Sequence, residues 1–267
     1  MEITEIIGYI LAIFVGMTLG MLGSGGSILS VPILVYVMGI EPTLATAYSL
    51  FVIGSASLVG GLQKAKQNQV DFKKVLLFGI PTVITVFITR KILVPRIPTI
   101  LLETDQFTLS KSVLIMLFFA VVMIVASIKM IKPSEVIEYR SEEKLNYYKI
   151  GIQGIVIGLI SGFVGAGGGF LIIPTLLFLA KTPMKMAVGT SLFIVASQSL
   201  IGFLGDIQGS QIIDWKLLSL FTICSILGIF IGNRIARKVE GNKLKTAFGW
   251  FVLAMGIYII IKEFLWT

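Results

Sequence analysis

Long apolar stretches separated by short polar ones dominate the chain. Stretches that contain no Asp, Glu, Lys or Arg lie at 44–62, 75–89, 112–128, 150–180, 186–205, 217–233 and 246–261. Uncharged apolar runs of about 18 residues or more are typical of helices that cross a lipid bilayer. The pattern therefore predicts an all-α integral membrane protein in which nearly the whole chain lies in the membrane.

The sequence matches itself when it is shifted by 142 positions. Eight of the 19 positions from 16 to 34 are identical to their counterparts at 158–176, and the similarity continues from 45–62 to 187–204. An apolar composition alone would not place glycines and serines in register, so the chain is a tandem duplication. The identical pairs of the first stretch are Gly16–Gly158, Gly20–Gly162, Gly23–Gly165, Gly25–Gly167, Gly26–Gly168, Leu29–Leu171, Pro32–Pro174 and Leu34–Leu176.

Each half divides into five apolar segments, about ten in all. We expect them at 6–22, 27–40, 44–63, 72–94 and 109–131 in the first repeat (1–131), and at 148–164, 169–180, 186–205, 215–236 and 246–264 in the second (148–267). Because five is an odd number, the second repeat has to lie in the opposite orientation in the membrane. The sequence thus predicts two inverted five-segment repeats joined by the polar stretch 132–147.

The positions of the basic residues predict the orientation. Sixteen of the 22 Lys and Arg residues fall on the side of the membrane that carries the 132–147 linker, and six fall on the other side. Lys and Arg accumulate on the cytoplasmic side of membrane proteins. We therefore expect a cytoplasmic linker and both termini outside.

Each repeat is predicted to open with a hairpin of two short helices around a glycine-rich loop. The arms have about 15 residues, roughly 23 Å of helix, against a hydrocarbon core of about 30 Å. The loops are Gly23-Ser24-Gly25-Gly26 and Gly165-Ala166-Gly167-Gly168-Gly169. Irregular backbone at membrane depth has to face protein or a water-filled cavity. Because one hairpin enters from each side, we expect the two loops to meet near the midplane, where inverted-repeat transporters bind substrate.

The second arm of each hairpin begins at the glycines, so its free N–H groups and positive dipole end point toward the loop. This arrangement suits an anion. These segments contain no Lys or Arg, so backbone amides and hydroxyls would hold the anion, completed by polar faces on the third segment of each repeat. The candidate substrate-binding residues are Gly23, Ser24, Gly25, Gly26, Ser27, Thr46, Ser49, Ser57, Gly165, Gly167, Gly168, Gly169, Thr190, Ser191 and Gln198.

Small residues and hydroxyls also mediate ordinary packing between membrane helices. The pairs Gly16–Gly20, Gly158–Gly162 and Gly228–Gly232 have the spacing typical of such contacts. For the hydroxyl faces, a packing role and a binding role both stay open. For the glycine loops binding is favoured, because packing does not require four glycines in five residues.

Composition narrows the function classes. The chain is 56% hydrophobic and 13% charged, with a mean hydropathy of +0.97. The net charge of +8 is spread over the ends of apolar segments rather than gathered in a patch, which does not fit a nucleic-acid partner. With no histidine and one cysteine, the sequence offers no His-based catalytic site, no zinc site and no cofactor site. No charge is expected within the spans, which argues against an enzyme and keeps a passive anion channel as an alternative to a carrier.

The motifs GMLGSGGSILSVPIL and GFVGAGGGFLIIPTL, followed by ATAYSLF and AVGTSLF, resemble the TauE/SafE family of membrane proteins. The resemblance covers almost the whole chain and implies transport of sulfite, organosulfonates or other small anions across the cell membrane. The sequence departs from it in the first half, where Tyr48 matches Thr190 and Ser27 matches Gly169. Expected partners are a small anion and the bilayer; a homo-oligomer, and a structural membrane protein without transport, stay open.

Overall fold

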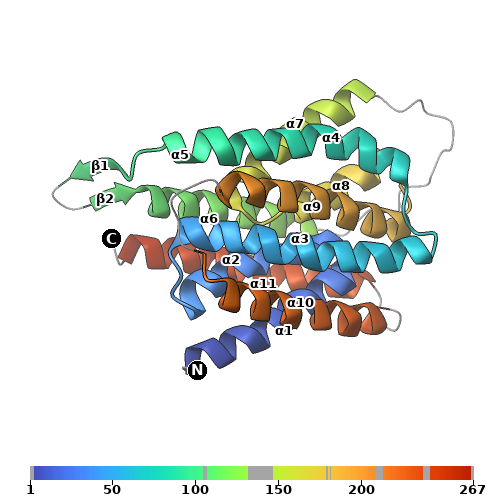
Figure 1. Ribbon diagram of the computed structural model, residues 1–267, viewed down its shortest axis with the longest axis horizontal. Helices are drawn as coiled ribbons and strands as arrows, with labels where there is room; N and C mark the ends of the chain where they lie inside the picture. The colour runs from blue at the N-terminus through green and yellow to red at the C-terminus, as the bar shows by residue number, and fades with distance from the viewer. Residues whose placement is uncertain are drawn as a thin grey trace.

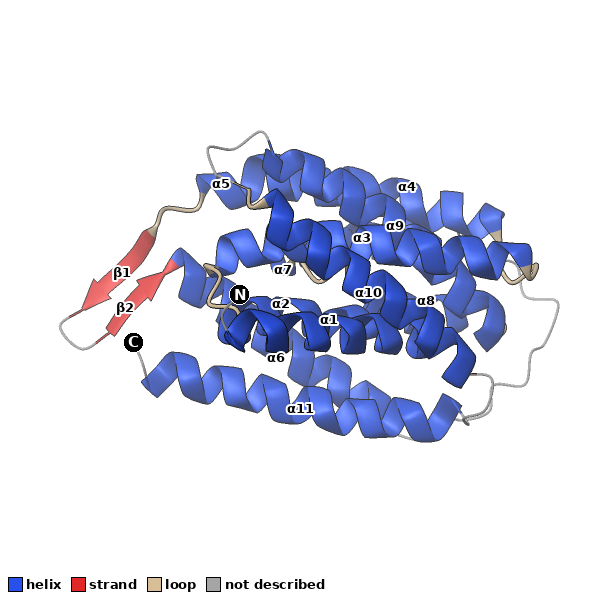
Figure 2. Cartoon of the chain, turned by 60° about the horizontal axis from the view of Figure 1, so that its bottom comes forward, coloured by secondary structure: helices blue, strands red, loops and turns tan. Residues whose placement is uncertain are grey.

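The structure is a computed structural model that describes residues 3–104, 107–131, 147–178, 180, 182–207, 213–236 and 241–265. Its helices form one elongated bundle and run roughly along the long axis, and a short β-hairpin projects from one end (Figures 1 and 2). The predicted all-α membrane architecture is confirmed. The predicted linker 132–147 lies outside the described residues except for Tyr147.

The first repeat contains α1 (Ile3–Leu22), the 3₁₀-helix η1 (Gly23–Leu29), α2 (Ser30–Pro32), the π-helical turn η2 (Ile33–Val37), α3 (Pro42–Lys66), α4 (Phe72–Ile88), the π-helical turn η3 (Thr89–Leu93), α5 (Val94–Arg96), β1 (Ile100–Thr104), β2 (Phe107–Ser110) and α6 (Lys111–Ile131). The second repeat contains α7 (Tyr147–Val164), α8 (Gly169–Phe178), α9 (Met184–Ile207), α10 (Trp215–Ile235) and α11 (Gly241–Leu265).

Six helices are long and apolar enough to cross a membrane among the described residues, at Thr4–Val37, Pro42–Lys66, Phe72–Arg96, Lys111–Ile128, Met184–Ile207 and Trp215–Ile235. Their outward faces are apolar. On α4, for example, Leu76, Ile80, Ile84 and Ile88 are all exposed and recur every four residues, so they form one stripe along the helix. An exposed apolar stripe of this length is stable in contact with lipid, which makes the chain a multi-pass membrane protein.

Glycines set the spacing of the first helix pair. Added Cβ atoms on Gly16 and Gly20 of α1 would overlap the backbone of α10, and a Cβ on Gly228 would overlap the carbonyl of Ile13 on α1. The Ser225 hydroxyl donates to the carbonyl of Ala12 at 3.1 Å in the same interface. The packing role predicted for this glycine spacing is therefore confirmed.

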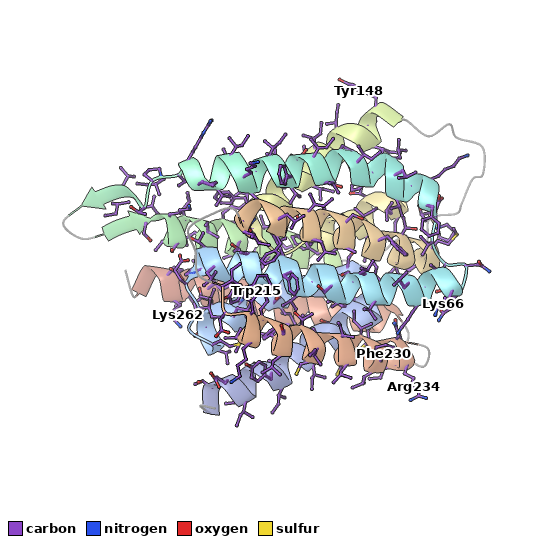
Figure 3. All side chains as sticks on the ribbon, in the orientation of Figure 1. Lys66, Tyr148, Trp215, Phe230, Arg234 and Lys262 are labelled. Atoms are coloured by element: carbon purple, nitrogen blue, oxygen red, sulfur yellow. The ribbon has the colours of Figure 1, made fainter. Side chains whose placement is uncertain are left out.

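The two repeats use equivalent contacts. The pair α1–α10 has its counterpart in α7–α4, and α3–α10 has its counterpart in α9–α4. The equivalent helices α3 and α9 pack on each other in antiparallel fashion, because Gly54 approaches Leu200 while Gly61 approaches Phe193. The start of α1 and the end of α11 lie at the left end of the bundle in Figure 1, whereas α3 and α10 end at the right. Figure 3 accordingly shows Lys66 and Arg234 at the right and Lys262 at the left.

Equivalent caps begin the fourth segment of each repeat. The Asp71 side chain accepts a hydrogen bond from the Lys74 amide at the start of α4, and Asp214 does the same for Leu217 at the start of α10. The Asp71 N–H in turn donates to Thr190 Oγ1 at 3.0 Å, and the Asp214 N–H donates to the hydroxyl of Tyr48 at 2.6 Å. The departure from the family pattern at Tyr48 thus keeps the hydroxyl in an equivalent contact.

Two details differ from the sequence-based expectation. The first arm is longer than predicted, because α1 begins at Ile3 and its 20 residues cover about 30 Å. The second arm of the second repeat is as short as expected, with ten residues in α8. The hairpin of β1 and β2, in which Thr104 pairs with Phe107, was not predicted because its strands are only five and four residues long.

Candidate functional site

The two predicted loops touch in the interior of the bundle. The Ser24 hydroxyl of the first loop donates to the carbonyl of Gly169 in the second at 3.1 Å, although 145 positions separate them. A Cβ on Gly169 would overlap Ser24, so the backbones could not approach this closely with another residue there. Residues 23–27 and 165–169 are all buried. We call these two segments the loop junction.

The two loops have different backbone conformations. Gly165, Gly167 and Gly168 have φ values of +73°, +66° and +58°, in the left-handed region that favours glycine, whereas only Gly23 does so in the first loop, with φ of +67°. The first loop forms the 3₁₀-helix η1 and continues directly into further helical turns. The second loop is irregular and ends where α8 begins at Gly169. The expected start of an α-helix at the loop is therefore found in the second repeat, and the expectation is wrong for the first.

Several buried polar groups in the first loop and on α3 and α9 have no hydrogen-bond partner within the described part of the chain. Ser27, Ser49, Ser57 and Ser199 are fully buried, and their hydroxyls are unpartnered. An unpaired buried polar group destabilises a protein by about 1–3 kcal/mol, so native structures normally satisfy such groups with protein, water or ligand. Each of these four hydroxyls is therefore free to bond a water molecule or a ligand.

Gln198 connects the third segment of the second repeat to the loop junction. Its Nε2 donates to the carbonyl of Gly167 and to the hydroxyl of Ser161 at 3.3 Å, while its Oε1 has no partner among the described residues. Ser199, one residue further on, lies 3.0 Å from where a Cβ on Gly167 would stand. The polar face predicted for this segment, α9, therefore contacts Gly167 of the second loop.

Other candidates make local or distant contacts. The Ser191 hydroxyl donates to the carbonyl of Val188 at 2.8 Å within its own helix. The Thr190 hydroxyl accepts a hydrogen bond from the Asp71 amide. Gly26 packs against the backbone of Thr18, whose hydroxyl donates to the Gly26 carbonyl at 3.3 Å. Gly25 has only ordinary contacts, the nearest at 3.8 Å from an added Cβ.

A buried arginine stands at the second loop, and the sequence analysis missed it. Arg90 is 1% exposed, and its Nη1 donates to Thr46 Oγ1 at 3.0 Å and forms an ion pair with Asp206 at 3.4 Å. A Cβ added to Gly165 would overlap both Thr46 and the Arg90 guanidinium. The expectation that no charge lies within the spans is therefore wrong, because Arg90 belongs to the span Phe72–Arg96 and Asp206 to the span Met184–Ile207.

A signal for Arg90 was present in the sequence. Thr82, Thr85 and Thr89 recur at helical spacing on α4 and η3, and the structure packs this face against Gly158 and Gly162 of α7. A polar face of this kind points away from lipid. Arg90 directly follows Thr89, the last threonine of this face. Because Arg90 also stands at the end of an apolar run, it resembled an ordinary cation that flanks a membrane span.

These features define a multi-pass membrane protein with a polar, partly unsatisfied interior around two duplicated loops. The family model described as sulfite exporter TauE/SafE matches residues 9–259, so the chain belongs to this family of membrane transporters.

Two bacterial relatives match this chain over nearly their full length, and a plant relative matches over a shorter stretch. The chain is 28% identical over 255 residues to a "Probable membrane transporter protein" of Xylella fastidiosa, covering 93% of this chain and 92% of the relative. It is 24% identical to the "Probable membrane transporter protein YunE" of Bacillus subtilis, covering 94% and 93%. Over 89 residues, 32% of this chain and 20% of the relative, it is 33% identical to the "Sulfite exporter TauE/SafE family protein 5" of Arabidopsis thaliana. No solved structure matches significantly.

Proposed function

We propose that this protein carries small anions across the cell membrane, with sulfite, organosulfonates and related sulfur-containing or organic anions as substrates, at a central site formed by the loop junction. The single observation that carries the proposal is that two glycine loops touch while the buried hydroxyls of Ser27, in the first loop, and Ser199, beside Gly167 of the second, have no partner among the described residues. Hydroxyls and backbone amides can replace the water around a small anion without holding it too tightly for release. The family and its printed description support the substrate class.

The proposal includes an inverted-repeat topology with both termini outside. It is supported by the antiparallel packing of the equivalent helices α3 and α9 and by the exchanged contacts of α1, α4, α7 and α10. Labelling of single cysteines with an impermeant reagent, in a Cys224→Ser background, tests the orientation. We expect Lys66→Cys to be protected in intact cells and Lys262→Cys to react; the opposite result would reverse the orientation.

An opening at the basic end of the bundle suits an inner entrance. A cavity of about 740 Å³ lies between the ends of α3 and α10, where Lys64 and Arg234 provide positive charge. The side chains of Gln63 and Asn233 meet there at 2.6 Å. In the repeat register, Lys64 and Gly232 occupy the positions equivalent to Asp206 and Arg90. The acidic residue of the buried pair thus corresponds to a lysine at the cavity, and its arginine corresponds to an uncharged glycine.

The buried ion pair bears on the channel alternative. That alternative rested on the absence of ionisable groups within the spans, which Arg90 and Asp206 contradict. Buried ionisable groups in membrane proteins mark substrate and ion pathways. We therefore propose a carrier rather than a passive channel.

A flux screen in liposomes tests the function and the mechanism together. Purified protein would be reconstituted and offered sulfite, sulfate, thiosulfate, sulfoacetate and a few carboxylates. We expect saturable uptake of sulfite or a sulfonate and its acceleration by unlabelled anion on the other side. Flux that rises linearly with concentration would show a channel, and the same flux with protein-free liposomes would refute transport.

A further inference from the structure

Arg90 is an incompletely coordinated cation in the interior of the bundle. It is among the largest fully buried side chains, and its Nε and Nη2 have no hydrogen-bond partner in the described part of the chain. A guanidinium carries five N–H donors in a planar fork. Among its polar and charged neighbours, Thr46 accepts one hydrogen bond, Asp206 lies within ion-pair distance without an aligned hydrogen bond, and Lys111 is close enough to act electrostatically on both members of the pair.

The local backbone places this cation at the second loop. Arg90 lies in the π-helical turn Thr89–Leu93, and single π-turns inside α-helices occur frequently at functional sites. A Cβ on Gly165 would overlap the Arg90 guanidinium, so only glycine leaves room for the cation beside the loop. The free donors of Arg90 therefore stand next to the loop junction rather than in lipid.

Burial without full pairing is costly for an arginine. Removing a guanidinium from water is compensated only when its donors find acceptors of good geometry. The carboxylate of Asp206, at 3.4 Å and 15% exposed, supplies charge but no hydrogen bond here. This arrangement is expected of a site in which a reversibly bound oxyanion accepts the hydrogen bonds of the guanidinium.

We propose that Arg90 is the cationic subsite for the transported anion, and that Asp206 is a tethered counter-ion which the anion displaces. The inference rests on the proposed function and names the group that recognises the substrate's charge. The planar fork matches the paired oxygens of sulfite, sulfonates and carboxylates, which accept two parallel N–H bonds. When the site is empty, Asp206 neutralises Arg90; because its carboxylate is not fully enclosed, it can turn away from Arg90 when an anion binds.

Substitutions of the two residues should then change the apparent affinity for the anion in opposite directions. Arg90→Lys keeps the charge but loses the fork, so we expect the KM for sulfite to rise roughly tenfold or more, as for loss of a charge-assisted hydrogen bond. Asp206→Asn removes the competitor, so the KM should fall several-fold. Arg96→Gln, an exposed arginine six residues from Arg90, is the matched control and should leave the KM unchanged.

The test is sulfite flux in liposomes with a melting temperature for each variant. If the pair were merely structural, both variants would melt lower and neither would lower the KM. If Arg90→Lys does not fold, Asp206→Asn decides alone: a lowered KM supports the inference, and an unchanged or raised KM overturns it. Absence of flux in the unmodified protein would refute the proposed function, whereas normal flux with an unchanged KM in Asp206→Asn refutes only this inference.

Discussion

Two glycines at equivalent positions of the repeats should respond differently to the same substitution. Gly25 and Gly167 are 142 positions apart and identical in the sequence register. The structure gives Gly167 a φ of +66°, whereas the φ of Gly25 is not in the left-handed region. We therefore predict that Gly167→Ala strongly destabilises the fold and that Gly25→Ala does not.

The magnitude follows from the two environments. At Gly167, an alanine would enter the left-handed region and its Cβ would stand 3.0 Å from Ser199 Oγ and 3.1 Å from both Ile53 and Val195. Strain of about 1–2 kcal/mol and overpacking of about 1–3 kcal/mol give a loss of roughly 2–5 kcal/mol. At Gly25, the nearest atoms would be at 3.8 and 3.9 Å, an ordinary contact. There the effect should stay within about 1 kcal/mol and can be stabilising, because alanine restricts the unfolded chain.

The assay is reversible unfolding in mixed micelles, followed by the fluorescence of the three tryptophans. Gly79→Ala is the control, because its Cβ would meet no atom within 4 Å and alanine favours the helix. Equal free energies of unfolding for Gly25→Ala and Gly167→Ala would refute the reasoning, since it assigns the difference to backbone strain and crowding at Gly167 that Gly25 does not have.

Two further predictions concern the scaffold. Gly228→Val should abolish the folded yield, because even a Cβ there overlaps the carbonyl of Ile13; a detergent-stable yield equal to that of Gly79→Val would contradict the packing of α1 on α10. Partial burial of Glu41 works against its ionisation, but hydrogen bonds from Ser112, Thr43 and the Leu44 amide outweigh it and lower the pKa of the carboxyl. Because the pKa of Glu41 is lower in the folded state, its ionised carboxylate stabilises the fold above the usual carboxyl pKa, and this stabilisation is lost as the pH falls through the folded pKa. The melting temperatures of the unmodified protein and Glu41→Gln should therefore differ at about pH 7 and converge toward about pH 3. A difference that persists in acid would refute this assignment.

Much of the architecture could be predicted because lipid restricts the chain so strongly. The duplicated glycines located the loop junction, and the uncharged runs located the long helices within a few residues. The two loops were expected to meet, and the hydrogen bond from Ser24 to the carbonyl of Gly169 joins them. The difference between Gly25 and Gly167 could not be predicted, because identical residues in a repeat need not share a backbone conformation.

The buried charge of the interior was the main feature that the sequence analysis failed to predict. A cation at the end of an apolar run is normally a flanking residue, and Arg90 became buried only because the Thr82 face of α4 packs on α7 and because α9 brings Asp206 to it. These are contacts between repeats, which spacing along one segment does not reveal. The hydroxyls of the predicted polar faces also behave in two ways. Ser191 donates a hydrogen bond within its own helix, whereas Ser57 and Ser199 have no partner among the described residues. Only the packed structure shows which hydroxyls belong to which group.

The most direct measurement of the central claim is sulfite flux by Ser57→Ala/Ser199→Ala. Because neither hydroxyl has a partner among the described residues, their removal should leave the melting temperature unchanged or raise it. If they bind the anion, the KM should nonetheless rise roughly tenfold or more, at about 1.4 kcal/mol per tenfold. Ser197→Ala, an exposed serine on the same helix whose hydroxyl bonds the Phe193 carbonyl, should behave as the unmodified protein. A well-folded double variant that transports sulfite with an unchanged KM would place the anion site away from the loop junction.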